Sequence, residues 1–426
     1  MKISVSKSQI KGEVSAPASK SYTIRGLMCA ALANGESEII SPLSSDDTEA
    51  ALAVLCKVGV KITRTSSAKE RGEAWRVVGD NFHEPETDLF CGDSAATLRF
   101  MTAICSLVPG ECRLVPGPSL ARRPIGPLVQ ALEQLGVDCS AQGEVAPVTV
   151  RGGRLMGGTA KLPGNISSQF VSALLLIAPL AERGVKIRLT TPLESKPYIL
   201  MTLECLRKFG ITVAASPDLS ELNTLPQVYK PAKYVVEGDW SSASYLLALG
   251  ALSGPVTVAN LNPESWQGDK VLLGFLREMG ALVGIDKNTV TVRKSRLNAI
   301  KANLSDCIDL LPTMAVLAVA ANGVSEFTGI ERARVKESNR VAAVRAGLEE
   351  MGIKVREERN RFTITGNTPK GATIDTQNDH RIAMAFSILG TMAGETIINN
   401  AECVSKTFPG FWDALRSIGG EVKEVE

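Results

Sequence analysis

The first indication of the fold comes from residues 19–35, which read SKSYTIRGLMCAALANG. The segment opens with Ser, Lys and Ser, continues in small and apolar residues, and closes at Gly35 before a β-prone run. Ile24, Leu27 and Ala31 keep the spacing of one helix face, yet the other faces are also Ala, Leu or Cys rather than charged. A helix that is apolar on most sides is buried. We therefore predict an inner helix that begins at a polar cluster.

The same pattern recurs six times, about every 70 to 75 residues, which indicates a repeat architecture. The polar openings are Ser19-Lys20-Ser21, Gly92-Asp93-Ser94, Asn165 to Gln169, Gly238 to Ser242, Asp306 to Asp309 and Asn378 to Arg381. The glycines that close these segments are Gly35, Gly110, Gly184, Gly254, Gly323 and Gly394. We expect each of these glycines to form a left-handed helix C-terminal cap.

Each repeat also predicts a second helix, which has a charged face and ends at a glycine before a β-prone run. These glycines are Gly59, Gly136, Gly210, Gly280, Gly352 and Gly419. Because the first helices are apolar all round, we expect an α/β fold with inner helices and outer sheets. Six copies divide into two halves of three repeats each. We expect the chain to cross from one half to the other in the Pro-rich region 216–233. A second crossing would lie near Lys11 if the first strand joins the C-terminal half.

The composition excludes several classes of protein. With 47 Lys and Arg against 45 Asp and Glu, the net charge of +2 is too balanced for a nucleic-acid binder. The start of the chain lacks the apolar core of a signal peptide, and residues 170–181 fall short of the roughly 18 apolar residues of a membrane helix. Nine Cys without a C-x-x-C pair indicate free thiols, and two His argue against a histidine-rich metal centre. We expect a cytoplasmic protein without a membrane, nucleic-acid or metal partner.

Positive charges stand where the inner helices begin. Lys20 and Arg381 both lie in an expected first turn, where a cation opposes the helix dipole unless an anion binds. Lys336 and Arg340 are four residues apart and share a helix face. Further cations precede second helices, at Arg122, Arg123 and Lys406. Together these positions predict a ligand with more than one phosphate or carboxylate.

Two carboxylates near these cations, Asp309 and Glu337, are candidates for acid–base chemistry. Structural alternatives remain open: we expect Asp93, Ser241 and Ser242 to be helix caps, and the cations before residue 340 also fit a solvated, salt-bridged helix start. The chain has no G-x-x-x-x-G-K-[ST] or G-x-G-x-x-G motif, so a nucleotide cofactor is not indicated.

Through all six repeats the chain resembles the 5-enolpyruvylshikimate-3-phosphate synthase family of enolpyruvyl transferases. The motifs that carry the resemblance are SKSYTIR at 19–25, RPIG at 123–126, SSQF at 167–170, SKPY at 195–198, EGDWSSASY at 237–245, RVKESNR at 334–340, DHRIAMA at 379–385 and KTFP at 406–409. The resemblance implies a two-domain inside-out α/β barrel, with three βαβαββ repeats in each domain and a hinge that closes over substrate. We expect one domain from residues 1–12 and 230–426 and the other from residues 13–229.

The resemblance also implies an activity, which is transfer of the enolpyruvyl group of phosphoenolpyruvate to the 5-hydroxyl of shikimate 3-phosphate, without metal or cofactor. It assigns to shikimate 3-phosphate the residues Lys20, Ser21, Arg25, Ser167, Ser168, Gln169, Ser195, Tyr198, Asp309 and Lys336. It assigns to phosphoenolpyruvate the residues Lys20, Ala95, Arg123, Gln169, Arg340, Arg381 and Lys406. Asp309 would take the hydroxyl proton and Glu337 would protonate the methylene carbon, while Lys20 could share either role. We expect a monomer.

Some positions depart from the pattern of the family. Asp93 stands where Asn is usual, Ala95 where Gly is usual and Phe100 where Pro is frequent; Arg332 replaces a frequent Asn, and Ile308 a frequent Pro. The phosphoenolpyruvate side of the pocket is therefore expected to differ. Because Ala95 carries a methyl group, we expect comparative tolerance of glyphosate, an inhibitor that resembles phosphoenolpyruvate but is longer.

Two alternatives belong to other classes. A UDP-N-acetylglucosamine enolpyruvyl transferase would share the fold, but it lacks the Ser-Ser-Gln and Ser-Lys-Pro-Tyr segments and would use a loop Cys. A non-catalytic phosphate-binding repeat scaffold would need the cations but neither Asp309 nor Glu337. The presence of both carboxylates argues against the scaffold.

Overall fold

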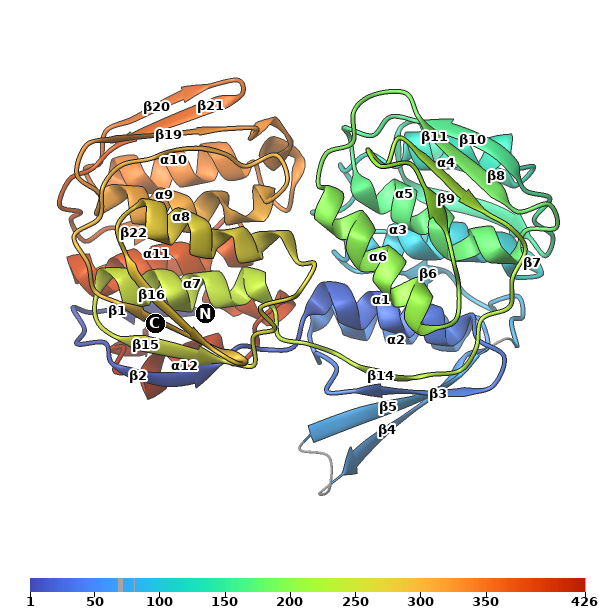
Figure 1. Ribbon diagram of the computed structural model, residues 1–426, viewed down its shortest axis with the longest axis horizontal. Helices are drawn as coiled ribbons and strands as arrows, with labels where there is room; N and C mark the ends of the chain where they lie inside the picture. Colours follow the sequence, from blue (N-terminus) through green and yellow to red (C-terminus); the bar gives the residue numbers. More distant parts are fainter. Residues whose placement is uncertain (68–71, 80, 426) are drawn as a thin grey trace. The chain divides into compact units, whose positions relative to one another are not determined.

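The computed structural model describes residues 1–67, 72–79 and 81–425 and divides the chain into two compact units (Figure 1). Unit 1 contains Met1–Pro17 and Glu237–Glu426, and unit 2 contains Ala18–Val236. The chain passes from unit 1 to unit 2 after Pro17 and returns to unit 1 after Val236. The division expected from the sequence placed these two boundaries after residues 12 and 229. Unit 1 is thus assembled from the two ends of the chain.

Unit 2 has three buried helices with sheets outside them. The inner helices are α1 (Lys20–Ala31), α3 (Ala95–Ile104) and α5 (Ser168–Ile177), and the second helices are α2 (Asp46–Lys57), α4 (Gly126–Gln134) and α6 (Lys196–Lys208). Nearly every residue of the inner helices is buried. The sheets are β14 (Lys233–Val235), β3 (Glu36–Ile40), β5 (Gly72–Val78) and β4 (Lys61–Ser67); β6 (Leu89–Phe90), β7 (Gly110–Val115), β9 (Val145–Gly152) and β8 (Asp138–Gln142); β10 (Gly158–Leu162), β11 (Val185–Leu189), β13 (Glu221–Thr224) and β12 (Ala214–Ala215).

Unit 1 repeats this plan. The inner helices are α7 (Trp240–Leu252), α9 (Leu311–Val319) and α11 (His380–Ala393), and the second helices are α8 (Leu272–Glu278), α10 (Arg340–Glu350) and α12 (Phe411–Ser417). The inner helices pack against one another, with every residue of α7 and α9 buried, and Figure 1 shows strands around them. The sheets are β16 (Leu282–Asp286), β17 (Thr289–Arg293), β15 (Val256–Ala259) and β2 (Gly12–Ser15); β18 (Lys301–Asn303), β19 (Val324–Thr328), β21 (Arg361–Thr365) and β20 (Val355–Glu358); β22 (Thr373–Ile374), β23 (Thr396–Asn399), β1 (Lys2–Val5) and β24 (Val422–Val425).

All six sheets in the described residues follow one rule: one edge pair is parallel and the other two pairs are antiparallel. Two edge strands come from distant parts of the chain, because β2 pairs in parallel with β15 and β14 pairs in parallel with β3. β1 lies between β23 and β24. The predicted inside-out arrangement of repeats is confirmed.

The glycines behave differently at the two kinds of helix. The six glycines that follow the second helices have φ between +78° and +104°, and each stands directly after the helix cap residue. For the first helices the expected left-handed cap is wrong even at Gly394, which is the C-cap of α11 but has φ 77° and ψ 173°, outside the left-handed helical region. Gly254 does not have a positive φ. The other four have positive φ values but stand several residues beyond their helices, directly before a strand or, for Gly110, as the first residue of one. Glycine therefore ends the second helices, where the chain turns sharply.

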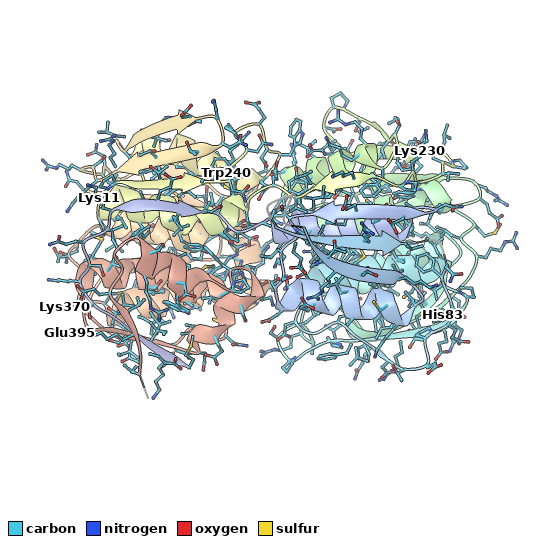
Figure 2. The ribbon with its side chains drawn as sticks, turned by 90° about the horizontal axis from the view of Figure 1, so that it is seen from below. Lys11, His83, Lys230, Trp240, Lys370 and Glu395 are labelled. Carbon is cyan, nitrogen blue, oxygen red and sulfur yellow. The ribbon has the colours of Figure 1, made fainter. Side chains whose placement is uncertain are left out.

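The chain is also tied across the ends of the second helices by a repeated hydrogen bond. In five repeats a backbone N–H donates at 2.9 or 3.0 Å to the carbonyl just before the capping glycine: His83 to Val58, Lys230 to Phe209, Asn298 to Met279, Lys370 to Met351 and Lys11 to Ile418. Figure 2 labels four of the donors, Lys11, His83, Lys230 and Lys370, which lie at the periphery of their units. These bonds satisfy carbonyls that a helix end leaves unpaired.

Candidate functional site

Side-chain caps fix the beginnings of five inner helices. Each cap is an oxygen that accepts a first-turn N–H: Ser19 from Tyr22 at 3.4 Å, Ser94 from Thr97 at 3.4 Å, Ser167 from Gln169 at 3.3 Å, Asp239 from Ser242 at 2.7 Å and Asp379 from Arg381 at 3.0 Å. Before α9 the chain forms a 3-10 turn, Ile308–Leu310, which contains Asp309. The polar openings of the repeats are therefore helix starts, as predicted.

The expectation that Asp93, Ser241 and Ser242 are caps is wrong. The caps of α3 and α7 are Ser94 and Asp239, which lie one to three residues from the expected positions. Asp93 Oδ1 instead accepts from the backbone N–H groups of the segment before α4, at 2.9 and 3.1 Å. Ser241 Oγ donates to the carboxylate of Asp269, a residue of the next segment in the repeat.

In unit 2, Lys20 is held by a carboxylate that the sequence analysis did not single out. Lys20 is the first residue of α1, and its Nζ lies 2.8 Å from Oδ2 of Asp47 on α2. The Lys20 side chain is 17% exposed, and Ser21 beside it is half-buried. The cation at this helix start therefore has a partner within the protein and remains partly accessible.

Arg25 is packed more deeply than its predicted role as a ligand suggests. It is 2% exposed, its Nε donates to Thr202 Oγ1 at 2.9 Å, and its Nη2 donates to the carbonyl of Tyr198 at 3.3 Å. The guanidinium carbon lies 5.3 Å from the ring centroid of Phe100 and 5.7 Å from that of Tyr198. These contacts place Arg25 under the Tyr198 region of the candidate site, where it orients α6 against α1.

Arg99 was missed by the sequence analysis and connects three candidate segments. Its Nη1 donates to Ser167 Oγ at 3.2 Å and to Gln169 Oε1 at 2.8 Å, and its Nη2 donates to the carbonyl of Pro124 at 2.9 Å. The guanidinium carbon also lies 4.8 Å from the ring centroid of Phe170. The one available signal was a cation within an otherwise apolar inner helix.

The other predicted residues of unit 2 lie at helix starts. Ala95 is the first residue of α3, Ser168 begins α5, and Arg123 stands shortly before α4; all three are buried. Ser195 precedes α6 with φ 56° and ψ 43°, and Tyr198 follows in the first turn. A left-handed backbone is uncommon for a residue with a side chain, and such conformations gather at functional sites.

In unit 1, Arg340 brings the candidate carboxylates together. It is the first residue of α10 and is 1% exposed. Its Nη1 donates to Asp309 Oδ1 at 2.6 Å, its Nε donates to Asp379 Oδ2 at 2.8 Å, and its Nη2 donates to Glu337. The two predicted acid–base residues, Asp309 and Glu337, thus share one buried guanidinium.

Three cations surround Asp309, and they set its charge. Besides Arg340, Lys336 Nζ lies 3.4 Å from Oδ1 and Arg381 Nη2 lies 3.6 Å from Oδ2. Burial alone would raise the pKa of Asp309, but the three cations hold it well below its usual range. Burial lowers the pKa of Lys336 to about 8, although Asp309 opposes this shift. Asp309 is therefore ionised at neutral pH, whereas Lys336 loses its proton just above neutral pH.

The remaining cations of unit 1 lie on or beside α11. Arg381 is buried in its first turn, and Lys406 is buried at the end of the 3-10 segment Ala401–Lys406, which packs against α11. Arg332 donates through Nη2 to the carbonyl of Ser305 at 2.6 Å, so it fastens the loop before Asp309. The structure thus gathers Asp309, Lys336, Glu337, Arg340 and Arg381 within unit 1.

The described part of the chain lacks two kinds of feature. None of its helices is long and apolar enough to cross a membrane. No cluster of three or more His, Cys, Asp or Glu side chains in this part of the chain has the arrangement of a metal site.

Comparisons with known proteins agree with one another. Residues 5–415 match the family model described as EPSP synthase (3-phosphoshikimate 1-carboxyvinyltransferase). A protein named 3-phosphoshikimate 1-carboxyvinyltransferase from Dehalococcoides mccartyi is 51% identical over 422 residues, with 99% of both chains covered. One of the same name from Methanosarcina mazei is 41% identical over 436 residues, covering 100% of this chain and 99% of the relative. The structure of EPSP synthase from Acinetobacter baumannii is similar with a TM-score of 0.82 and 25% identity, covering 99% of this chain and 100% of that one.

Proposed function

The chain belongs to the EPSP synthase (3-phosphoshikimate 1-carboxyvinyltransferase) family, and from this membership we propose which of its residues perform the reaction. The reaction is the transfer of the enolpyruvyl group of phosphoenolpyruvate to the 5-hydroxyl of shikimate 3-phosphate in the shikimate pathway, with release of inorganic phosphate. Both substrates are polyanions. Cations at helix starts in both units are suited to bind them.

In this proposal shikimate 3-phosphate is bound by polar side chains. Its ligands in unit 2 are Lys20, Ser21, Arg25, Ser167, Ser168, Gln169, Ser195 and Tyr198, and in unit 1 they are Asp309 and Lys336. The hydrogen bonds from Arg99 to Ser167 and Gln169 support this assignment, because they hold two of these side chains in place before substrate arrives. Phosphoenolpyruvate is bound by Lys20, Ala95, Arg123, Gln169, Arg340, Arg381 and Lys406.

The chemistry needs a base and an acid. Asp309 removes the proton of the 5-hydroxyl, whose oxygen then bonds to C2 of phosphoenolpyruvate, and Glu337 gives a proton to the C3 methylene. The tetrahedral adduct then expels phosphate as C3 loses a proton to the Glu337 carboxylate. Lys20 shares the proton transfer. The observation that carries this proposal is the position of Asp309, an ionised buried carboxylate with Arg340, Lys336 and Arg381 within 3.6 Å.

We further propose that the protein acts as a monomer in the cytoplasm. The support for a monomer is that each unit has its own core of buried hydrophobic side chains.

A direct assay tests the activity. Phosphate release should require phosphoenolpyruvate and shikimate 3-phosphate together, and the organic product should contain both carbon skeletons by mass spectrometry. Phosphate released from phosphoenolpyruvate alone, or no release with both substrates, would refute the assignment.

Lys336 should give the reaction a basic pH limit. Because its pKa is about 8 in the free protein, we expect kcat/KM for shikimate 3-phosphate to fall about tenfold between about pH 7 and pH 9 as the cation is lost. The fall cannot come from unfolding through Lys336. A lysine whose folded pKa lies below its unfolded value binds fewer protons when folded, so its contribution to stability grows as pH rises above 8.

The test for Lys336 is the pH profile of Lys336→Arg. Arg stays charged, so this variant should lose the decline above about pH 8. Lys354→Arg, an exposed Lys in the same unit, is the matched control and should keep the parental profile. The prediction fails if Lys336→Arg and the parent show the same decline.

Ala95 should discriminate between phosphoenolpyruvate and glyphosate. Its methyl group, at the start of α3, narrows the space that a Gly would leave, so the longer inhibitor should lose more affinity than the substrate. We expect Ala95→Gly to lower the ratio of the glyphosate inhibition constant to the phosphoenolpyruvate KM by about tenfold or more. Ala96→Gly, the next residue of the helix, controls for the general effect of glycine in the first turn. An unchanged ratio in Ala95→Gly would remove the steric argument.

A further inference from the structure

The segments that follow strands β6 and β7 lie side by side in unit 2. The two strands form a parallel pair, so both end at the same edge of their sheet. Residues 91–94 then lead into α3, and residues 116–125, which we call the Arg123 loop, lead into α4. The Gly117 N–H donates to the Gly92 carbonyl at 2.6 Å. The segment before α3 is therefore in direct contact with the Arg123 loop.

The Asp93 side chain adds to this contact. Its Oδ1 accepts a hydrogen bond from the Ser119 N–H at 2.9 Å and another from the Leu120 N–H at 3.1 Å. The Leu120 side chain is fully buried in the core of unit 2, so the loop is anchored at the same point by its own side chain. The Arg123 N–H in turn donates to the Leu120 carbonyl at 3.0 Å. Leu120 thus connects Asp93 with Arg123.

Gly117 allows the two segments to approach this closely. A Cβ atom on Gly117 would lie 2.7 Å from Asp93 Oδ1 and 2.9 Å from the carbonyl carbon of Gly92. These distances are shorter than a real Cβ contact, so a larger residue would displace the loop from Asp93. The contact is therefore specified at two positions, by the oxygen of Asp93 and by the missing side chain of Gly117.

The far end of the Arg123 loop is held by Arg99. The Nη2 of Arg99 donates to the Pro124 carbonyl at 2.9 Å, and its Nη1 donates to Gln169 Oε1 at 2.8 Å. Arg123 lies between this point and the Asp93 contact and is itself 7% exposed. The position of the loop therefore decides where the Arg123 cation lies.

We propose that Asp93 is a positioning residue for phosphoenolpyruvate, which fastens the Arg123 loop so that the Arg123 guanidinium is in place before this substrate binds. The proposal rests on the proposed function, in which Arg123 is a ligand of phosphoenolpyruvate. Without the two hydrogen bonds to Asp93, the loop has more conformations in the free protein. Binding must then order the loop, and the entropy lost in ordering it weakens the affinity.

The first test compares Asp93→Ala with Asp93→Asn. Ala removes the oxygen that the two N–H groups need, whereas Asn keeps an oxygen at the same place. At saturating shikimate 3-phosphate, we expect the KM for phosphoenolpyruvate to rise about tenfold in Asp93→Ala and to change less than about twofold in Asp93→Asn. The dissociation constant for shikimate 3-phosphate, measured by calorimetry, should change less than about twofold in both variants, because Arg99 still holds Ser167 and Gln169.

Two results of this comparison would overturn the proposal. One is a parental KM for phosphoenolpyruvate in Asp93→Ala. The other is equal impairment of Asp93→Asn and Asp93→Ala, because the charge of Asp93 would then matter rather than its hydrogen bonds to the loop. Asp138→Ala, which changes an exposed Asp of the same unit, is the control and should match the parent.

Hydrogen–deuterium exchange tests the loop without either substrate. The amide groups of Ser119 and Leu120 should exchange about tenfold faster in Asp93→Ala than in the parent, and at the parental rate in Asp93→Asn. Gly117→Ala should also accelerate exchange and raise the KM for phosphoenolpyruvate, because its methyl group displaces the loop. Gly274→Ala is the matched control, since a Cβ atom there has open space among the described residues.

The exchange measurement separates this inference from the proposed function. If Arg123→Met kept the parental KM for phosphoenolpyruvate, the assignment of Arg123 as a ligand would be wrong. Exchange needs no substrate, so it would still decide whether Asp93 holds the loop. Parental exchange of Ser119 and Leu120 in Asp93→Ala would overturn the inference, whatever the activity of the variant.

Discussion

Replacing Asp309 by Asn is expected to lower turnover by about 10² to 10⁴ while shikimate 3-phosphate still binds. The carboxylate is ionised because Lys336, Arg381 and Arg340 hold its pKa well below the usual range, so at any working pH it is in the form that a general base requires. Asn has the same shape and can still accept from Arg340, but it cannot take a proton. Glu337→Gln should cause a loss of the same order, because it removes the proposed proton donor to the methylene carbon.

The measurement must separate binding from turnover. Calorimetry with shikimate 3-phosphate gives the affinity, and single-turnover phosphate release gives the chemical step. Asp306→Asn changes an exposed carboxylate three residues before Asp309 and is the matched control. Near-parental turnover in Asp309→Asn or in Glu337→Gln would remove that residue from the mechanism.

Arg340→Met should destabilise unit 1 by about 3–5 kcal/mol at neutral pH. The substitution keeps an unbranched apolar stem but removes the guanidinium that Asp309, Glu337 and Asp379 share. Three carboxylates would then be left in a largely buried site without their common cation. Breaking a buried ion pair by removing one partner is strongly destabilising, because the remaining charge stays desolvated.

The pH dependence identifies this mechanism. The folded pKa of Asp309 is lowered in the parent, so its contribution is present above the unfolded pKa and is lost as pH falls through the folded value. In Arg340→Met the carboxylates take up protons more easily, so the stability difference from the parent should shrink below about pH 4. A constant difference across this range would mean that lost packing, not unpaired charge, is the cause.

Unit 1 can be monitored by itself. Three of the four Trp residues, Trp240, Trp266 and Trp412, lie in unit 1, and only Trp75 lies in unit 2. Urea unfolding followed by fluorescence in a Trp75→Phe background therefore reports unit 1. Arg345→Met, on the exposed side of the same helix, is the control and should change the free energy of unfolding by less than about 1 kcal/mol.

The inner helices and their starting points could be predicted because their signals are local. The segment SKSYTIRGLMCAALANG by itself indicates an apolar helix that follows a polar cluster. The glycine after each second helix marks a turn that few other residues form. Which residue caps each helix could not be predicted from the sequence. Asp93 and Ser94 are both good caps, and only the backbone decides that Ser94 caps α3 while Asp93 binds the segment before α4.

The internal partners of the arginines could not be predicted, because those contacts join distant parts of the chain. Arg25 bonds to Thr202, which is 177 residues away, and Arg99 bonds to Gln169, which is 70 residues away. The family resemblance predicts Arg25 as a ligand, a role that stays a prediction, and Arg99 was overlooked. In both cases a buried guanidinium donates to groups that only the tertiary structure brings near.

The order in which the chain emerges from the ribosome matters for a protein whose first strand lies between its last two. Unit 2 is one continuous stretch, so its core can form once Val236 has left the exit tunnel. β1 must wait, because its neighbours β23 and β24 are nearly 400 residues later in synthesis. At about 5–20 residues per second, this delay lasts roughly 20 to 80 seconds. During that time the N-terminal strand has no native partner, and the nascent chain carries a folded unit 2 beside an incomplete unit 1.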